Sequence, residues 1–176
     1  MAKWDDATID WYAKTHGEDL TTRSVVEAAP FSAADAILDI GCGTGASLRH
    51  LAALGAEGRL VGVDPSERMI CHARRLSPDR LEFAMASAED LPFPDAAFDG
   101  VLAVNSVNHW PDPAAGFAEA SRVLRPGGWI AAGGEVFDVT DGAVDVAEGL
   151  RLAGFVDIRD QDIAGGAVTM ARKGRQ

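Results

Sequence analysis

A chain of 176 residues, 47% hydrophobic and 24% charged, has the composition of one globular domain with a buried core and not of a disordered chain. Its formal net charge of −11 disfavours nucleic acid and anionic membrane surfaces as partners, because an acidic protein repels both. Two cysteines are too few for a disulfide framework, and no cysteine or histidine has a metal-ligand spacing. We find no signal-peptide pattern and no apolar run that could span a bilayer, so we expect a cytoplasmic protein without a metal. The only local basic cluster is residues 172–175.

Residues 1–35 are predicted to form a pair of helices. Apolar and aromatic side chains recur in an acidic setting before Pro30. The pair either packs on the core as a plain cap or partly covers a cofactor cleft. In the second case Tyr12 and His16 are candidates for contact with a substrate.

Three glycines at alternate positions follow the apolar run 37–40 and precede a helical pattern over residues 45–54. Glycines let the backbone turn tightly and let a ligand approach main-chain atoms, and a helix start adds unpaired N–H groups. The segment 41–46 fits the G-x-G-x-x-G/A fingerprint of dinucleotide-binding folds. It also resembles the D-x-G-x-G-x-G motif of class I S-adenosylmethionine-dependent methyltransferases, with Asp39 as the acid. A third interpretation is a tight turn without a ligand.

A second strand over residues 59–64 ends in an acid. Asp64 lies about twenty residues beyond the glycines, where a carboxylate can accept both hydroxyl donors of an adenosine ribose. The alternative is that Asp64 only caps the next helix, which Pro65 and Ser66 also suit.

The rest of the chain alternates strands and helices, which predicts right-handed crossovers and a parallel sheet. A helix is expected with Met69, Ala73 and Leu76 along its packed face before the turn at Pro78, and further helices from about 111 to 124 and over about 143–153. Further strands are expected at 81–86, 98–105, 129–132, 155–158 and 167–170. The last two strands are joined through Gly165 and Gly166 by so short a link that they must run antiparallel. A parallel sheet closed by an antiparallel hairpin is not the ordinary dinucleotide-binding arrangement, so the tail favours the methyltransferase interpretation.

Five blocks in the expected order carry a wider resemblance: residues 37–45, 61–70, 88–99, 108–113 and 122–128. Over residues 35–172 the chain resembles class I methyltransferases of the small-molecule type, close to the ubiquinone/menaquinone-biosynthesis-like group. The resemblance implies an α/β fold, a Rossmann-like three-layer sandwich with a mostly parallel seven-stranded sheet in the order 3-2-1-4-5-7-6 and its last strand antiparallel. We expect a single domain over 1–176, with an N-terminal helical cap at 1–35 and the core at 36–172.

The resemblance also implies S-adenosyl-L-methionine as the cofactor and a set of residues around it. They are Asp39, Gly41, Cys42, Gly43, Gly45, Asp64, Pro65, Met69, Ser87, Ala88, Glu89 and Asn105. Asp39 and the glycine backbone would hold the methionine part, and Asp64 the ribose. Pro65 and Met69 would sandwich the adenine ring.

The adenine edge is where the sequence departs from its relatives. Ser87 and Ala88 would meet this edge, and Asn105 would offer a carbonyl to the amino group. Related sequences usually carry an aspartate where Ser87 stands, and a serine hydroxyl is a shorter, uncharged acceptor. Glu89 could compensate for that difference.

A sulfonium methyl group is already activated, so the protein mainly has to align the acceptor and exclude water. A general base is needed only where the acceptor must lose a proton. His109 is the first candidate because it follows the fourth strand at the carboxyl edge of the sheet. It can equally be a structural or packing residue beside Trp110, which is itself a candidate substrate contact. Tyr12 and His16 are weaker candidates for the base.

The acceptor is predicted to be a small molecule. An N-P-P-Y-like tetrapeptide is absent at 105–108, which disfavours methylation of DNA base amino groups. The short connection at about 137–142 indicates an open cleft, an exposed acceptor, or completion by a second subunit in a homodimer. Two other functions remain open: a non-catalytic methyltransferase-like accessory protein, and a nicotinamide-dependent oxidoreductase.

Overall fold

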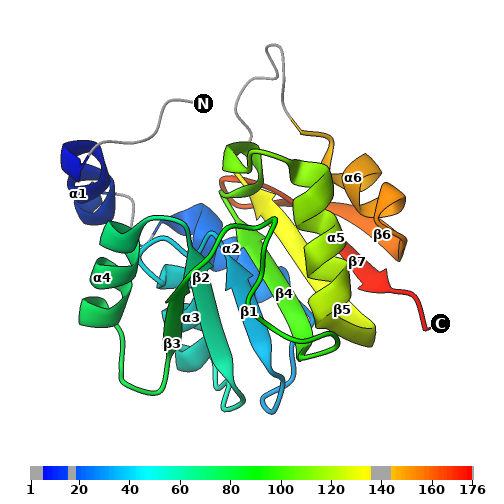
Figure 1. The fold of residues 1–176 in the computed structure, drawn as a ribbon, viewed down its shortest axis with the longest axis horizontal. Helices are drawn as coiled ribbons and strands as arrows, with labels where there is room; N and C mark the ends of the chain where they lie inside the picture. The colour runs from blue at the N-terminus through cyan, green and yellow to red at the C-terminus, as the bar shows by residue number, and fades with distance from the viewer. Residues whose placement is uncertain (1–5, 16–18, 136–143, 176) are drawn as a thin grey trace.

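The computed structural model describes residues 6–15, 19–135 and 144–175, with the backbone alone for residues 6 and 12–15. It contains a seven-stranded sheet in the order β3-β2-β1-β4-β5-β7-β6 (Figure 1). The strands are β1 (Ile37–Ile40), β2 (Leu60–Asp64), β3 (Glu82–Met85), β4 (Phe98–Val104), β5 (Leu124–Gly134), β6 (Phe155–Ile163) and β7 (Gly166–Lys173). Strands β1 to β5 pair in parallel, and β7 runs antiparallel to both β5 and β6. This arrangement confirms the predicted strand order and the antiparallel last strand.

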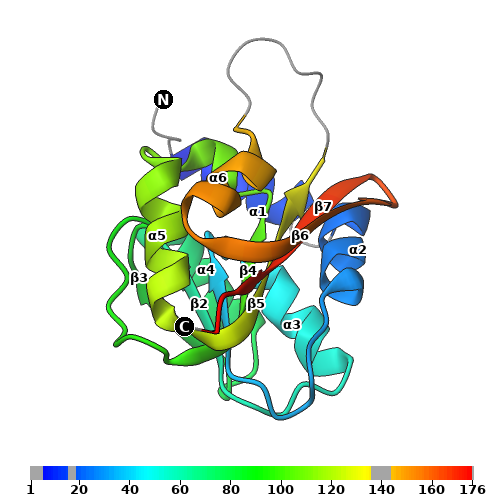
Figure 2. The same ribbon diagram turned by 90° about the vertical axis from the view of Figure 1, so that its right-hand side faces the viewer.

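Helices cover both faces of the sheet, so the molecule has three layers. Figure 2 shows α5 and α6 on one side of the strands and α2 and α3 on the other. The helices are α1 (Asp6–Thr15), α2 (Leu20–Ala28), α3 (Ala46–Ala53), α4 (Glu67–Leu76), α5 (Pro113–Val123) and α6 (Val146–Leu152), with a 3-10 helix η1 (Val107–His109) after β4.

The core is divided by the sheet into two clusters. Neighbouring residues of a strand point to opposite faces. Leu38 accordingly packs in the cluster with Phe117 of α5, whereas Ile37 packs in the cluster with Val25 of α2 and Leu48 of α3. All four residues of β1 are buried, which explains why its apolar residues do not alternate with exposed polar ones; Asp39 is its one polar residue.

The two N-terminal helices attach in different ways. Val25 of α2 is fully buried, so α2 contributes to the core. Helix α1 lies against α4, where the Asp10 carboxylate pairs with Arg68 and lies 2.9 Å from Nε2 of His72. These two partners hold the pKa of Asp10 well below its usual range. The α1 attachment is therefore largely polar, with Ile9 as its buried apolar residue.

Some predicted boundaries are wrong. The helix expected up to Leu124 ends at Val123, and β5 begins at Leu124 rather than at Trp129. Leu124 pairs with Phe98, and an irregularity in the register after Phe98 accommodates the residues between Leu124 and Trp129. Leu76, predicted on the packed face of its helix, is 47% exposed because it is the last residue of α4.

Within the described ranges, no helix is long and apolar enough to cross a membrane. The same residues contain no group of three or more histidine, cysteine, aspartate or glutamate side chains that could hold a metal ion.

Candidate cofactor-binding site

The turn between β1 and α3 depends on its glycines. Gly41, Gly43 and Gly45 have φ angles of 75°, 51° and 78°, in the left-handed region that favours glycine. A Cβ on Gly41 would lie 2.4 Å from Cβ of Ser106, so a larger residue cannot fit there. A Cβ on Gly43 would have no heavy atom within 4 Å. The backbone at Gly43 therefore faces open space, which is the geometry that a ligand needs to approach it.

Asp64, at the end of β2, lies against this turn. Its Oδ2 accepts a hydrogen bond from the Gly43 N–H at 3.0 Å, and its Oδ1 accepts one from the Ser66 N–H at 2.8 Å. Burial raises the pKa of Asp64, while these two bonds and the charge of His109 oppose the rise. A carboxylate has about four lone-pair positions, so two acceptor positions remain for hydroxyl donors such as those of a ribose.

Asp39 is buried directly below the turn. Its side chain is 1% exposed, and neither oxygen makes a hydrogen bond of ordinary geometry within the described part of the chain. Burial raises its pKa to about 7, the charge of Asp64 adds to this effect, and Ser47 opposes it. A buried carboxylate is expensive unless a cation or donors face it. The arrangement fits a positively charged group bound above the turn.

Cys42 has a buried side chain in the glycine turn and packs against β2. It is 7% exposed, and burial together with the charges of Asp39 and Asp64 raises its thiol pKa well above the usual value. Its Sγ would be 2.8 Å from a Cβ on Gly62, so the thiol occupies the space that this glycine of β2 leaves. These contacts indicate a packing role between β1 and β2.

The start of α4 lies beside Asp64. Ser66 caps the helix by accepting a hydrogen bond from the Met69 N–H at 3.3 Å. Met69 is buried, and Pro65 is exposed. The helix cap is thus supplied by Ser66, and Asp64 stabilises the turn that leads into it.

The segment that follows β3 carries the predicted adenine-edge residues. Ala88 is buried and Ser87 is half-buried. The Glu89 carboxylate accepts a hydrogen bond at 3.1 Å from the backbone N–H of Asp112, the N-cap of α5. Glu89 therefore links this segment to α5, a role that the sequence did not indicate.

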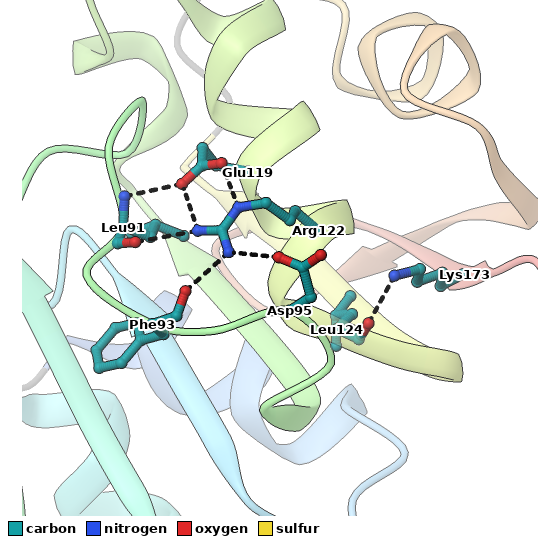
Figure 3. A network of polar contacts seen from close by, with 7 residues as sticks. All are labelled: Leu91, Phe93, Asp95, Glu119, Arg122, Leu124 and Lys173. Carbon is teal, nitrogen blue, oxygen red and sulfur yellow. Dashed lines mark hydrogen bonds and ion pairs between the residues drawn. The ribbon is translucent and has the colours of Figure 1, made fainter.

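Arg122 fastens the same segment to α5 (Figure 3). Its five N–H donors make five hydrogen bonds, and their acceptors are two oxygens of Glu119, the carbonyls of Leu91 and Phe93, and Oδ1 of Asp95. Glu119 in turn accepts a bond from the Leu91 N–H at 2.9 Å. Arg122 thus holds the segment directly, through the carbonyls of Leu91 and Phe93, and indirectly, through Glu119.

The end of β4 completes the carboxyl edge of the sheet. Asn105 has a φ of 51°, and its Oδ1 accepts a bond from the Glu135 N–H at 2.9 Å, which ties β4 to the end of β5. Ser106 donates a buried hydrogen bond of 2.7 Å to the Ile40 carbonyl and so joins the ends of β4 and β1. Sequence patterns could not indicate this role of Ser106, because the contact joins residues 66 positions apart.

His109 and Trp110 differ in placement. His109 is exposed in η1, and its charge influences Asp64, so the two side chains share this edge. Trp110 is 7% exposed and packs edge-on against Phe117 with ring centroids 5.3 Å apart. That position belongs to the core, so the hypothesis of substrate contact by Trp110 gains no support from it. His16 and the side chain of Tyr12 lie outside the described residues.

A family comparison decides between the interpretations of this site. Residues 38–132, more than half of the chain, match the family model described as a methyltransferase domain. The chain belongs to the S-adenosylmethionine-dependent methyltransferases. The cofactor of this methyltransferase is S-adenosylmethionine, which agrees with the unpartnered Asp39 carboxylate and the open approach to Gly43.

Two named relatives come from bacteria. The chain is 37% identical over 138 residues to 27-O-demethylrifamycin SV methyltransferase of Amycolatopsis mediterranei, a match covering 74% of this chain and 48% of the relative. It is 43% identical over 112 residues to demethylmenaquinone methyltransferase of Clavibacter sepedonicus, covering 62% of this chain and 43% of the relative. The chain thus spans a little under half the length of these relatives.

Solved structures agree on the fold. A chain from the complex between the Haloferax volcanii Trm112 methyltransferase activator and a methyltransferase has a TM-score of 0.83 and 21% identity. The match covers 98% of the present chain and 100% of that chain. At this identity the likeness shows the fold alone.

Proposed function

We propose that this chain transfers the methyl group of S-adenosylmethionine to a small-molecule acceptor. The observation that carries the proposal is the buried Asp39 carboxylate, which has no hydrogen-bond partner in the described residues and lies below a turn whose Gly43 faces open space. The names of the two relatives support a small acceptor, since one refers to a demethylrifamycin and the other to a demethylmenaquinone.

The proposed binding arrangement uses the residues named from the sequence. Asp39 and the backbone at Gly41, Gly43 and Gly45 would hold the methionine part, and the two remaining acceptor positions of Asp64 would take the ribose hydroxyls.

The adenine ring would lie between Pro65 and Met69. The segment held by Arg122 would present Ser87 and Ala88 to the adenine edge, and Asn105 would offer its carbonyl to the amino group. When bound, the cofactor supplies a methyl group on a positively charged sulfur.

His109 is proposed as the general base for acceptors that must lose a proton. It is exposed at the edge of the sheet that carries Asp64, and an imidazole can accept a hydroxyl proton near neutral pH. Replacing His109 with alanine should lower turnover by about a hundredfold or more while leaving the affinity for the cofactor unchanged. A matched control is His50→Ala, because His50 pairs with Glu27 between α3 and α2.

The decisive experiment has two steps. Thermal-shift and calorimetric titrations with S-adenosylmethionine, S-adenosylhomocysteine and NAD should show binding of the first two only. Transfer of a labelled methyl group to a metabolite panel that includes 27-O-demethylrifamycin SV and demethylmenaquinone should then yield product. Binding without transfer to any acceptor would favour the accessory-protein alternative, and unchanged turnover of His109→Ala would remove that residue from the mechanism.

We also propose an oligomeric state and a location in the cell, each with its own test. A homodimer could complete the acceptor side of the cleft, and light scattering at several protein concentrations would test it. We also propose a cytoplasmic location, which fractionation of the native host would test.

A further inference from the structure

A cavity lies at the edge of the sheet opposite to the glycine turn. It has a volume of about 470 Å³ and is lined by Gly127, Val156, Asp157, Arg172, Lys173 and Arg175. Gly127 lies near the start of β5, whereas the glycine turn follows the end of the parallel strand β1. In Figure 1 the C-terminal segment accordingly lies at the lower right, beside the start of β5 and away from the end of β1.

Three of the six lining residues are cations without a carboxylate partner. Arg172 donates to the Gly127 carbonyl at 3.2 Å, and Lys173 donates to the Leu124 carbonyl at 2.7 Å, as Figure 3 shows for Lys173. Both acceptors are neutral, and no ion pair involves Arg172, Lys173 or Arg175 within the described part of the chain. Elsewhere in the described residues, Arg59, Arg68, Arg122, Arg125 and Arg151 pair with carboxylates, whereas Arg74 and Arg80 donate to backbone carbonyls as Arg172 does. What sets the cavity apart is that three such cations line one hollow of a protein whose formal net charge is −11.

The backbone around the cavity is shaped by two left-handed residues. Gly127 has a φ of 80°, and Nε of Arg175 would lie 3.6 Å from a Cβ at this position, so the Arg175 side chain lies over the turn at the start of β5. Asp157 has a φ of 54° at the irregularity in the pairing of β6 with β7. It brings one carboxylate to the cavity, which reduces the formal charge of the lining from three to two positive charges.

We propose that this cavity binds a small molecule through a phosphate or diphosphate group. A phosphate oxyanion has several acceptor oxygens, which matches the remaining donors of two guanidinium groups and one ammonium group. The cavity lies within the size range of small-molecule sites, so it can take more than the phosphate itself. Because it is at the amino edge of the parallel strands, the ligand would be separate from the methyl donor and would act as a regulator or second ligand rather than as the methyl acceptor.

The experiment is a titration of the isotope-labelled full chain with pyrophosphate and with glycerol 3-phosphate, followed by NMR in about 150 mM NaCl to screen weak surface contacts. The expected result is saturable shifts of the amides of Gly127, Asp157 and residues 172–174 at ligand concentrations below about 10 mM. Absence of saturable shifts, or shifts centred on the glycine turn, would overturn the proposal. Binding to vesicles that contain phosphatidic acid, without saturable binding of glycerol 3-phosphate, would also overturn it, because the ligand would then be a membrane surface.

Two variants should change affinity in opposite directions. Arg175→Gln should weaken binding and Asp157→Asn should strengthen it, each by about three- to tenfold, since one removes an attractive and the other a repulsive charge. Asparagine tolerates a positive φ, and Arg175 is exposed, so neither variant is expected to unfold the protein. The matched control is Arg159→Gln, an exposed arginine of β6 that does not line the cavity. An effect of Arg159→Gln equal to that of Arg175→Gln, or no gain from Asp157→Asn, would contradict a specific site.

Discussion

At the scale of single residues, Asp39 and Asp64 of the proposed cofactor site differ in their surroundings. Both carboxylates are close to the glycine turn, but Asp64 has two backbone hydrogen bonds and Asp39 has none within the described residues. Burial consequently dominates at Asp39 and raises its pKa to about 7. Burying a carboxylate without a hydrogen-bond partner costs free energy, which a bound cation would offset. The burial of Asp39 is therefore consistent with a positively charged ligand.

The raised pKa of Asp39 predicts a pH-dependent stability of the protein without cofactor. The folded-state value of about 7 lies above the unfolded value of 3.8, so the folded state binds the extra proton. The associated stability is fully present below about pH 4 and is lost as pH rises through about 7. Asp39→Asn should therefore raise the melting temperature at pH 8 by roughly 3–8 °C, with a much smaller difference at pH 4.

Differential scanning calorimetry of the wild type and Asp39→Asn at both pH values measures this effect, and Asp35→Asn provides a comparison. A gain that is the same at pH 4 and pH 8 would contradict the assignment to ionisation of Asp39. The same variant should bind S-adenosylmethionine more weakly, because it lacks the negative charge proposed to face the ammonium group.

Ser87 gives a second prediction at this scale. An aspartate there would add a charged acceptor at the proposed adenine edge, so Ser87→Asp should bind S-adenosylmethionine at least as tightly as the wild type. Isothermal titration calorimetry measures the affinity, with Asp90→Asn as a nearby control. A large loss of affinity would be inconsistent with this placement of the adenine ring.

At the scale of elements, the position of the segment after β3 depends on hydrogen bonds from side chains of α5. The segment after β3 has little regular structure, yet Arg122 and Glu119 of α5 hold its backbone at Leu91 and Phe93. A planar guanidinium can direct five donors at once, whereas an ammonium group has three in a different geometry. Arg122 is thus a positioning residue for the predicted adenine edge, acting through the backbone.

This arrangement predicts that Arg122→Lys is not a conservative change. We expect a melting temperature lower by roughly 3–6 °C, because several hydrogen bonds to the segment are lost, and a several-fold weaker affinity for S-adenosylmethionine. Arg151→Lys is the matched control, because the partner of Arg151 in the described residues is Glu148 on the exposed side of α6. Equal cofactor affinity of Arg122→Lys and wild type would show that the segment keeps its position without the guanidinium.

At the scale of the whole molecule, the sequence predicts elements better than the contacts between them. The buried strands could be predicted because each is a short apolar run, and the position of Asp64 followed from its distance to the glycines. The bonds of Ser106 to Ile40 and of Glu89 to Asp112 could not be predicted, since they join segments that only the folded sheet brings together. Boundaries failed where pairing overrides local signals, as at Leu124, which pairs with Phe98 despite the proline and glycines that follow it.

The proposed single domain makes a prediction about cooperativity. The sheet lies between the two core clusters. Trp110, which is 7% exposed, belongs to one cluster, and Trp129, which is 3% exposed, belongs to the other. Leu38 and Ile37 of β1 belong to different clusters. Loss of either cluster would therefore expose the face of β1 that the cluster covers and disturb the strand that both clusters share. We expect both tryptophans to report the same urea midpoint.

The measurement uses two variants, each with Trp4 and Trp11 replaced by phenylalanine and either Trp110 or Trp129 also replaced. In each variant the fluorescence midpoint of the remaining core tryptophan should coincide with the far-ultraviolet circular dichroism midpoint, which makes the comparison independent of the stability change caused by the substitutions. Separate midpoints within one variant would mean that the layer of α5 and α6 and the layer of α2 and α3 unfold independently. Coincident midpoints would establish that the two layers unfold as one cooperative unit, so that a ligand of the folded state stabilises both.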